Sequence, residues 1–390
     1  MKIARFAESA SPVLGGYPGN EYLVCRGLAG LGHDVTLFTS NAPPSRYFLD
    51  KQDMNQEQDA SESFRVIRTD AALTLGGDAP LMPFLLRKAW RLGAEIVHAH
   101  EAYQPSSLMA WFLSLKNQAA FTFSQERYYT AKRRAWRVPM WMVDKTLVPL
   151  TYRSAKMATA FSSAAAAYLS EQGYPRERVK IMPMCMDPSK FQVPGTPWLR
   201  RKLGLGKKEP LVLSVARLHK SKGLVHLLEA MLKVTRAVRD VKLAIVGRGR
   251  EEWNLRSYAS DLGLGKSVFF LTDFIQHSEL ASCYHEADVF ALPSLYETFG
   301  VSVIEAMAAG KPVVVSDVGG MRDTVINFET GFRVRPGDAD GLARALLRLL
   351  NDSGPRESMG RQARKAALKY DWHVVARMYQ TFYEELVSMN

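Results

Sequence analysis

Short apolar runs alternate with amphipathic stretches along this chain, and the alternation occurs in two separate series. In the first series, apolar runs of strand length are followed by helical patterns, and Gly32 ends the first predicted helix. The first-series strands are predicted at 2–7, 34–39 and 95–100. From Leu211 the alternation begins again, with strands predicted at 211–216, 241–246, 268–272, 289–292 and 313–316. Helices are predicted there at 223–236, 251–262, 278–286, 300–309, 338–351 and 355–369. Strand–helix repetition of this kind predicts an α/β protein with parallel sheets and right-handed crossovers.

The segment between the two series is the best candidate for a domain boundary. Residues 187–210 are rich in proline and contain three glycines, a composition typical of a linker. A chain of 390 residues is also too long for one ordinary hydrophobic core. We therefore predict a first domain over 1–190, a linker over 191–210 and a second domain over 211–371.

Composition places the chain among water-soluble globular proteins. It is 47% hydrophobic and 23% charged, and no apolar run approaches the roughly 18–20 residues of a membrane helix. Its three cysteines are far apart, which argues against a disulfide framework and against a zinc cluster. The first eight residues carry charges where a secretory signal would be apolar. We expect a cytoplasmic protein.

The net charge of +12 is unevenly distributed. Residues 1–121 hold 11 basic and 12 acidic side chains, whereas 122–190 hold 12 basic and 5 acidic ones. A second excess lies in 196–222, with eight basic residues and one acid. Two separate basic regions suggest two different anions, which we take to be an acceptor or membrane surface for the first and a diphosphate for the second.

The most informative stretch is 293–312, which places Glu297 and Glu305 eight residues apart around the start of a predicted helix. Gly300 lets another backbone or a ligand approach closely, and the first amide groups of a helix form a site for anions. Two carboxylates beside such a site suit a ligand that carries both hydroxyls and phosphates. A nucleotide sugar is a ligand of this kind.

Arg217 and Lys222 follow the predicted strand 211–216 directly. Cations at the carboxyl end of a parallel strand lie where α/β sheets bind ligands. Two fixed cations could neutralise a departing diphosphate without a metal ion. The alternative is a solvated basic loop, which the downstream glutamates make less attractive.

Two glycine motifs fall where a phosphate could approach the backbone. Gly15 and Gly16 lie between the first strand and the first helix, but no G-x-G-x-x-G motif occurs there, which counts against a dinucleotide oxidoreductase. Gly247 belongs to a Gly-Arg-Gly sequence after the strand 241–246. We interpret Gly247 as mainly structural, with a ribose or base contact as the alternative.

His98 and His100 lie in one predicted strand, where we place their side chains on opposite faces and therefore expect no shared metal ion. One of them is expected to be a core histidine. Asp338 and Asp340 form an Asp-x-Asp sequence, but Asp338 precedes a helical pattern and is predicted to cap it. We predict no metal site.

The segment 125–141 interleaves cations with aromatic residues. This composition is typical of binding to a membrane surface. No recognisable nucleic-acid module accompanies it, so we expect no nucleic-acid partner. Packing within its own domain is the alternative. The candidate membrane or acceptor patch consists of Arg127, Lys132, Arg133, Arg134, Trp136, Arg137 and Trp141.

Taken in order, these motifs resemble family 4 retaining glycosyltransferases of the GT-B fold. The block 297–310 is the specific part, and Ala216 replaces a glycine usual in the Arg217–Gly223 element. The resemblance implies two Rossmann-like domains with parallel sheets facing a central cleft, and a last helix over 372–389 that crosses back to the first domain.

The resemblance also implies roles for the candidate residues. Glu297 and the backbone amides of Phe299, Gly300 and Val301 would hold the sugar hydroxyls, and Glu305 the ribose. Arg217, Lys222 and the Gly16 amide would stabilise the leaving diphosphate. His100 would face the donor sugar.

The implied activity is retaining transfer of a hexose-type sugar from a UDP- or GDP-sugar to a glycan or lipid-linked acceptor, in polysaccharide or glycolipid synthesis. No cofactor or metal is expected, and the enzyme would be cytoplasmic or peripheral at the inner face of a membrane. The alternatives are a GT-B nucleotide-sugar 2-epimerase, or a non-catalytic protein that binds membranes or polyanions and has a degenerate sugar site.

Overall fold

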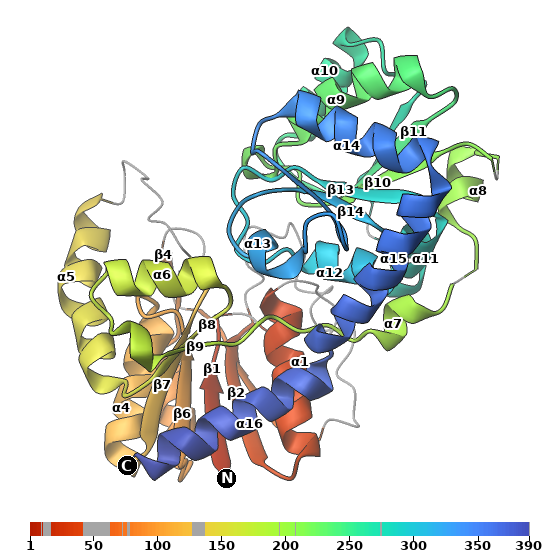
Figure 1. Ribbon diagram of the computed structural model, residues 1–390. Helices are drawn as coiled ribbons and strands as arrows, with labels where there is room; N and C mark the ends of the chain where they lie inside the picture. Colours follow the sequence, from red (N-terminus) through yellow and green to blue (C-terminus); the bar gives the residue numbers. More distant parts are fainter. Residues whose placement is uncertain are drawn as a thin grey trace. The chain divides into compact units, whose positions relative to one another are not determined.

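The computed structural model of the chain consists of two compact α/β units (Figure 1). One unit comprises Met1–Cys185 together with Trp372–Asn390, and the other comprises Met186–Asp371. The structure describes residues 1–8, 10, 17–41, 63–71, 73–75, 79–126, 137–194, 196–206, 208–273 and 275–389. Each unit is described by itself below.

The first unit is built on a parallel sheet with the strand order β3-β2-β1-β6-β7-β8-β9. Its strands are β1 (Lys2–Phe6), β2 (Asp34–Ser40), β3 (Arg65–Thr69), β6 (Ile96–His100), β7 (Ala120–Gln125), β8 (Ala158–Ala160) and β9 (Val179–Ile181). Its helices are α1 (Tyr17–Gly30), α3 (Pro83–Ala89), α4 (Pro105–Asn117), α5 (Arg137–Ser154), α6 (Ser163–Glu171) and α16 (Trp372–Ser388). A short antiparallel pair, β4 (Leu73–Leu75) and β5 (Ala79–Leu81), completes it. The chain adds β2 and β3 on one side of β1 and then crosses over to add β6 on the other side. β1 and β6 are therefore neighbours and form a switch point of the kind at which α/β sheets bind ligands.

The second unit repeats this design with the strand order β12-β11-β10-β13-β14-β15, again all parallel. The strands are β10 (Leu211–Val215), β11 (Lys242–Val246), β12 (Val268–Leu271), β13 (Val289–Leu292), β14 (Val313–Ser316) and β15 (Gly331–Val334). The helices are α7 (Ser189–Gln192), α8 (Leu199–Leu203), α9 (Leu224–Ala237), α10 (Glu252–Asp261), α11 (His277–Glu286), α12 (Val301–Ala308), α13 (Met321–Thr324), α14 (Ala339–Asn351) and α15 (Ser353–Ala367). The buried side chains of α9 and α14 pack on β10, β11 and β13 to form its main core.

The prediction of two parallel α/β sheets is therefore confirmed. The strands predicted from 211 onward agree with the observed ones to within about one residue, whereas β15 was not predicted. The segment predicted as a linker, 191–210, lies within the second unit and includes α8. The backbone amides of Trp198, Leu199 and Arg200 donate to the carboxylate of Glu286 on α11, at 2.8–2.9 Å. These bonds anchor a proline-rich segment that its composition had predicted to be a linker.

The last helix, α16, packs against α1 in the first unit and contributes to a buried polar network. Arg5 on β1 is 1% exposed and donates to both carboxylate oxygens of Glu21 on α1, with a shortest contact of 2.8 Å. Its Nη1 donates to the hydroxyl of Tyr383 on α16 at 2.5 Å, and that hydroxyl lies 2.8 Å from Nδ1 of His98. The network links a residue near the start of the chain to one 378 positions later.

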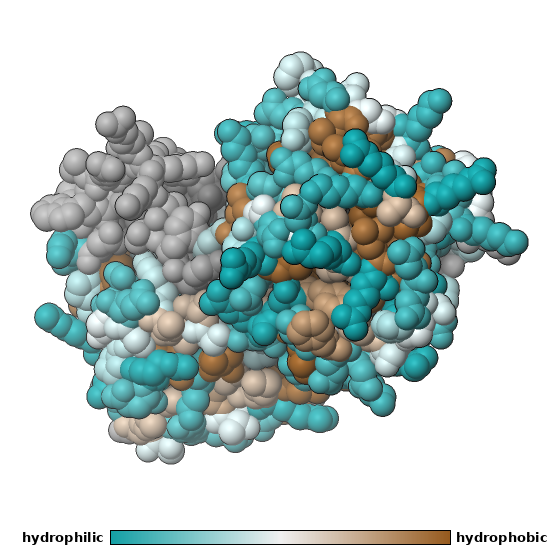
Figure 2. Space-filling view, turned by 45° about the horizontal axis from the view of Figure 1, so that its top comes forward, coloured by the Kyte–Doolittle hydropathy of each residue, from teal (hydrophilic) through white to brown (hydrophobic). Residues whose placement is uncertain are grey.

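Surface composition agrees with a protein whose apolar side chains are largely buried. On the face shown in Figure 2, hydrophilic residues dominate and apolar residues form separate patches. Within the described ranges, no helix combines the length and the hydropathy needed to cross a bilayer.

Candidate functional site

The predicted charged residues of the second unit gather in loops that follow its parallel strands. Lys222 follows β10 and Glu297 follows β13, and Nζ of Lys222 donates to Oε2 of Glu297 at 2.5 Å. The Ser294 hydroxyl donates to the same oxygen at 3.1 Å. The side chains of Lys222 and Glu297 are 13% and 9% exposed, so this ion pair is largely shielded from water. The structure thus brings together a cation and a carboxylate 75 residues apart in sequence, at the edge of the sheet where ligands bind.

Arg217 lies in the same loop but is in a different environment. Its side chain is exposed, and in the described part of the chain it takes part in no side-chain hydrogen bond or ion pair. The loop therefore holds one exposed guanidinium and one shielded, ion-paired ammonium.

The helix start at Gly300 has the predicted geometry. Gly300 caps α12 with φ 87° and ψ 60°, a left-handed conformation that a side chain would disfavour. Val301 is the first residue of α12, so its amide belongs to the unpaired first turn. The Phe299 ring is 1% exposed and packs edge-on against Tyr370, with centroids 5.5 Å apart. Phe299 can therefore offer only its backbone to a ligand.

Glu305 lies on α12, 9% exposed, and accepts a hydrogen bond of 2.6 Å from the Tyr284 hydroxyl on α11. Burial raises the pKa of the Glu305 carboxyl to about 7, although Tyr284 and Lys190 act in the opposite direction. A carboxylate held in this way has one oxygen fixed by the protein and a charge that depends on pH near neutrality.

At Gly247, the loop after β11 lies directly against the loop after β10. A Cβ at this position would lie 2.0 Å from the carbonyl oxygen of Ala216, and its φ is 140°. Only glycine allows the two loops to approach this closely. The structural interpretation of Gly247 is the one that the geometry supports.

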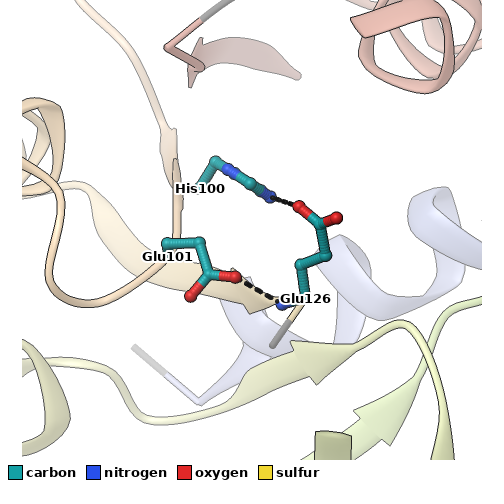
Figure 3. Close-up of side chains that lie close together, drawn as sticks. All are labelled: His100, Glu101 and Glu126. Carbon is teal, nitrogen blue, oxygen red and sulfur yellow. Dashed lines mark hydrogen bonds and ion pairs between the residues drawn. The ribbon is translucent and has the colours of Figure 1, made fainter. Parts of the chain in front are cut away.

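A second group of charged residues lies at the carboxyl ends of β1, β6 and β7 in the first unit. His100 Nδ1 lies 2.8 Å from Oε2 of Glu8, and Oε1 of Glu8 accepts from the Gln104 side chain at 2.6 Å. Figure 3 shows His100 pointing toward Glu126, with Nε2 and Oε2 3.7 Å apart, while the Glu126 amide donates to Glu101 at 2.9 Å. Burial alone would lower the pKa of His100, but Glu8, Glu101 and Glu126 outweigh it and raise that pKa above its usual value.

Backbone strain accompanies this group. Glu101 is 1% exposed and has φ 60°, a conformation that non-glycine residues adopt at a cost. Ligand atoms of His100, Glu101 and Glu126 lie within 4.8 Å of one another, which is close enough for a divalent cation. The same geometry also suits a protonated imidazole held by carboxylates.

The placement of His98 and His100 on opposite faces of their strand is wrong. Both lie on β6, and residues two apart on a strand project to the same side. Their roles differ because their neighbours differ. Burial, with Arg5 beside it, holds the pKa of His98 well below its usual value, so the neutral ring accepts from Tyr383 at Nδ1 and donates from Nε2 to Ser124 at 2.7 Å. His98 is the expected core histidine.

Several predicted residues fall outside the described residues. Gly15 and Gly16 do, and so do Arg127, Lys132, Arg133, Arg134 and Trp136. Arg137 and Trp141 lie on α5, of which the backbone is described there. Asp338 does cap α14, accepting from the Gly341 amide at 2.7 Å, as predicted.

Sequence reasoning missed two residues that hold candidate side chains in place, Tyr284 and Glu8. Tyr284 stands 21 positions before Glu305 and Glu8 stands 92 positions before His100, so no local spacing marks either contact. The only available signal for Glu8 was a charged residue directly after the first strand, at the edge where ligands bind.

Comparison with known proteins shows the family of the chain. Residues 197–366 match the family model described as glycosyl transferases group 1, and residues 22–185 match that of a glycosyl transferase 4-like domain. Together the two matches cover most of the chain. The chain belongs to the family 4-type glycosyltransferases. All candidate residues of the second unit lie within the group 1 match.

Individual similarities support the same family. The chain is 34% identical to an uncharacterized glycosyltransferase of Methanocaldococcus jannaschii over 245 residues, which are 61% of this chain and 62% of that protein. Sucrose-phosphate synthase from Thermosynechococcus elongatus has a similar structure, with a TM-score of 0.78, 26% identity and 100% coverage of both chains. HepE from Anabaena, in complex with UDP and glucose, has a TM-score of 0.77 at 20% identity over 99% of this chain and 100% of that one. These likenesses identify the GT-B fold of a family 4-type glycosyltransferase and do not favour an epimerase or a non-catalytic protein.

Proposed function

We propose that this glycosyltransferase moves a hexose-type sugar, with retention of configuration, from a UDP- or GDP-sugar to a glycan or lipid-linked acceptor. The observation that carries the proposal is the shielded Lys222–Glu297 pair beside the start of α12, at 2.5 Å. A cation suits phosphate, a carboxylate suits hydroxyls and the first amides of a helix suit an anion, and this combination supports the proposal. The solved HepE structures contain UDP and glucose, which supports a nucleotide-sugar donor.

In this proposal each residue acts on one part of the donor. Glu297 and the amides of Gly300 and Val301 hold sugar hydroxyls, and Glu305 accepts from the ribose. Lys222 and Arg217 stabilise the negative charge that grows on the diphosphate as the bond from the anomeric carbon to the phosphate oxygen breaks. The acceptor oxygen forms its bond on the same face of the sugar, and its proton passes to the leaving phosphate.

His100 is proposed to contact the donor sugar, on the strength of the family resemblance. Its close pairing with Glu8, at 2.8 Å, supports a ring fixed in one orientation with Nε2 directed away from Glu8. No metal is required in this scheme, because the two cations of the second unit supply the charge.

The test is a binding and hydrolysis screen across UDP- and GDP-sugars, followed by assignment of the anomeric configuration of the product. Binding of one nucleotide sugar by the wild-type protein, and its loss in Glu297→Ala and Lys222→Ala, is the expected result. A product with inverted configuration would contradict the retaining mechanism. Failure of every nucleotide sugar to bind would contradict the donor class.

A further inference from the structure

A surface hollow of about 540 Å³ lies in the second unit where β15 ends and α14 begins. It is lined by the edge strand β15, the turn before it and the first turns of α14, which is labelled in Figure 1. None of the donor-site residues proposed above lines it. The volume falls within the range usual for small-molecule sites, about 300–1,000 Å³.

The charge of this hollow is strongly positive. Its lining contains four arginines, Arg333, Arg335, Arg344 and Arg348, and one acid, Asp338. One oxygen of Asp338 already accepts from the Gly341 amide at 2.7 Å, and its other oxygen lies 4.0 Å from Arg344. Asp338 in the lining and Asp317 beside Arg333 are thus two acids set against four guanidinium groups, which leaves a positive excess.

One of these arginines has a donor left over. Arg333 Nη1 donates to the carbonyl of Arg322 at 3.1 Å and lies 3.6 Å from Asp317. Its Nε is buried and has no hydrogen-bond partner among the described residues. A buried donor without a partner costs free energy unless a ligand or water completes it.

An exposed aromatic ring stands beside the arginines. Phe328 is 65% exposed, and its φ of 67° is unusual for a bulky residue. A backbone bond of 2.8 Å from the Phe328 amide to the Gly331 carbonyl closes the turn, and the ring packs edge-on against Phe332 at 5.6 Å. The guanidinium of Arg348 lies over Phe332, 5.4 Å from its centroid. The turn thus has a strained backbone and holds a solvent-facing ring next to a cluster of cations.

We propose that this hollow binds a phosphate-bearing saccharide, either a free sugar phosphate or a phosphorylated glycan. The planar guanidinium groups fit phosphate oxygens in pairs, and the exposed Phe328 ring offers an apolar surface for the C–H face of a sugar. The site is additional to the donor site and does not depend on the proposed transfer reaction.

Calorimetric titration of the full chain with glucose 6-phosphate, inorganic phosphate and glucose tests the proposal. We expect glucose 6-phosphate to bind, inorganic phosphate to bind more weakly and glucose not to bind. Replacing two of the three exposed arginines in Arg335→Gln/Arg344→Gln should weaken glucose 6-phosphate binding by about tenfold or more, since each charged hydrogen bond contributes at least that much. The charge-matched control Arg239→Gln/Arg361→Gln, at exposed positions elsewhere in the unit, should bind as the wild type does.

Two further variants distinguish the contribution of the sugar from that of the phosphate, and this hollow from the donor site. Phe328→Ser should weaken the binding of glucose 6-phosphate but leave the binding of inorganic phosphate unchanged, because only the sugar contacts the ring. Arg217→Gln/Lys222→Gln, which removes the donor-site cations, should retain glucose 6-phosphate binding.

Loss of binding in that variant with retention in Arg335→Gln/Arg344→Gln would assign the anion to the donor site and overturn the proposal. Equal binding of glucose, or no binding of glucose 6-phosphate to the wild type, would also overturn it. A phosphorylated oligosaccharide that binds more tightly than glucose 6-phosphate would identify a glycan as the source.

Discussion

At the scale of single residues, Glu305 illustrates how a buried carboxylate, here one proposed to bind the donor, opposes the stability of its own fold. Burial raises its pKa to about 7, while the Tyr284 hydroxyl and the charge of Lys190 favour the ionised form. Because the folded-state pKa lies above the unfolded value, the folded protein binds the extra proton between roughly pH 4.5 and 7, and stability falls as the pH rises through that window.

The first prediction follows from this fall of stability with rising pH. Glu305→Gln, which cannot ionise, should be more stable than the wild type above pH 7, by on the order of 3 kcal/mol, and should lose little stability as the pH rises. The same variant should bind nucleotide more weakly. Denaturant unfolding on both sides of the Glu305 pKa measures the first effect and calorimetry the second. A variant less stable than the wild type at high pH would refute the assigned cost of the buried charge.

Tyr284→Phe isolates the group that holds Glu305. Removing the 2.6 Å hydrogen bond should raise the pKa of Glu305 further, so nucleotide affinity should fall near neutral pH and recover in part as the pH rises. A purely structural role for Tyr284 would lower affinity equally at every pH. The pH profile of nucleotide binding therefore decides between the two.

Lys222 and Arg217 should differ although both are proposed to stabilise the diphosphate. Either alanine variant should slow the chemical step about a hundredfold. Lys222→Ala should in addition lower stability, since it removes the cation that neutralises the shielded Glu297 carboxylate, whereas Arg217 is exposed. The donor assay and unfolding measurements test this contrast. Activity that disappears with EDTA and returns with Mg²⁺ or Mn²⁺ would instead favour a metal at His100, Glu101 and Glu126.

At the scale of elements, the sequence pattern was a good guide to the strands of the second unit and a poor guide to contacts, and in the first unit it did not predict β3, β7, β8 or β9. β10, β11 and β13 are short runs of mostly apolar, mostly buried residues, so their limits could be read directly. β15 starts at Gly331 and ends among arginines, and it carries no such signal. The pairing of Glu8 with His100 depends on β1 and β6 being neighbours, which is a property of topology and not of any one element.

The glycine loop after β11 gives the prediction at this scale. Gly247→Ala should cost about 1–3 kcal/mol, since its φ of 140° is strained for alanine and a Cβ would meet the Ala216 carbonyl oxygen. Because the Ala216 loop leads to Arg217, donor binding should weaken as well. The matched control is Gly265→Ala, where a Cβ would meet no described atom within 4 Å. Equal unfolding midpoints for the two variants would contradict the close approach of the loops.

At the scale of the whole molecule, the basic and aromatic patch that begins at Arg127 gives a prediction about membranes. Its region 122–190 carries 12 basic and 5 acidic residues, and each cation near an anionic bilayer contributes about 1 kcal/mol of attraction. We expect salt-sensitive co-sedimentation with vesicles that contain anionic lipid, and its loss when Arg133 and Arg134 are replaced by glutamine. Replacing Arg239 and Arg361 in the same way provides the charge-matched control. Binding that does not respond to salt, or to the replacement of Arg133 and Arg134, would favour the alternative that the segment packs within its own domain.

The position of α16 has a consequence for how the protein is made. Ribosomes deliver a chain from its amino end, and amino-terminal domains usually fold first. Here the first unit lacks Tyr383, the partner of the buried Arg5 and His98, until the 186 residues of the second unit have been synthesised. At about 5–20 residues per second this delay is roughly 10 to 40 s. During that interval the unit that starts first is incomplete, and the second unit, contiguous in sequence, can fold before it. The nascent first unit should therefore be the part of this glycosyltransferase that depends on chaperones.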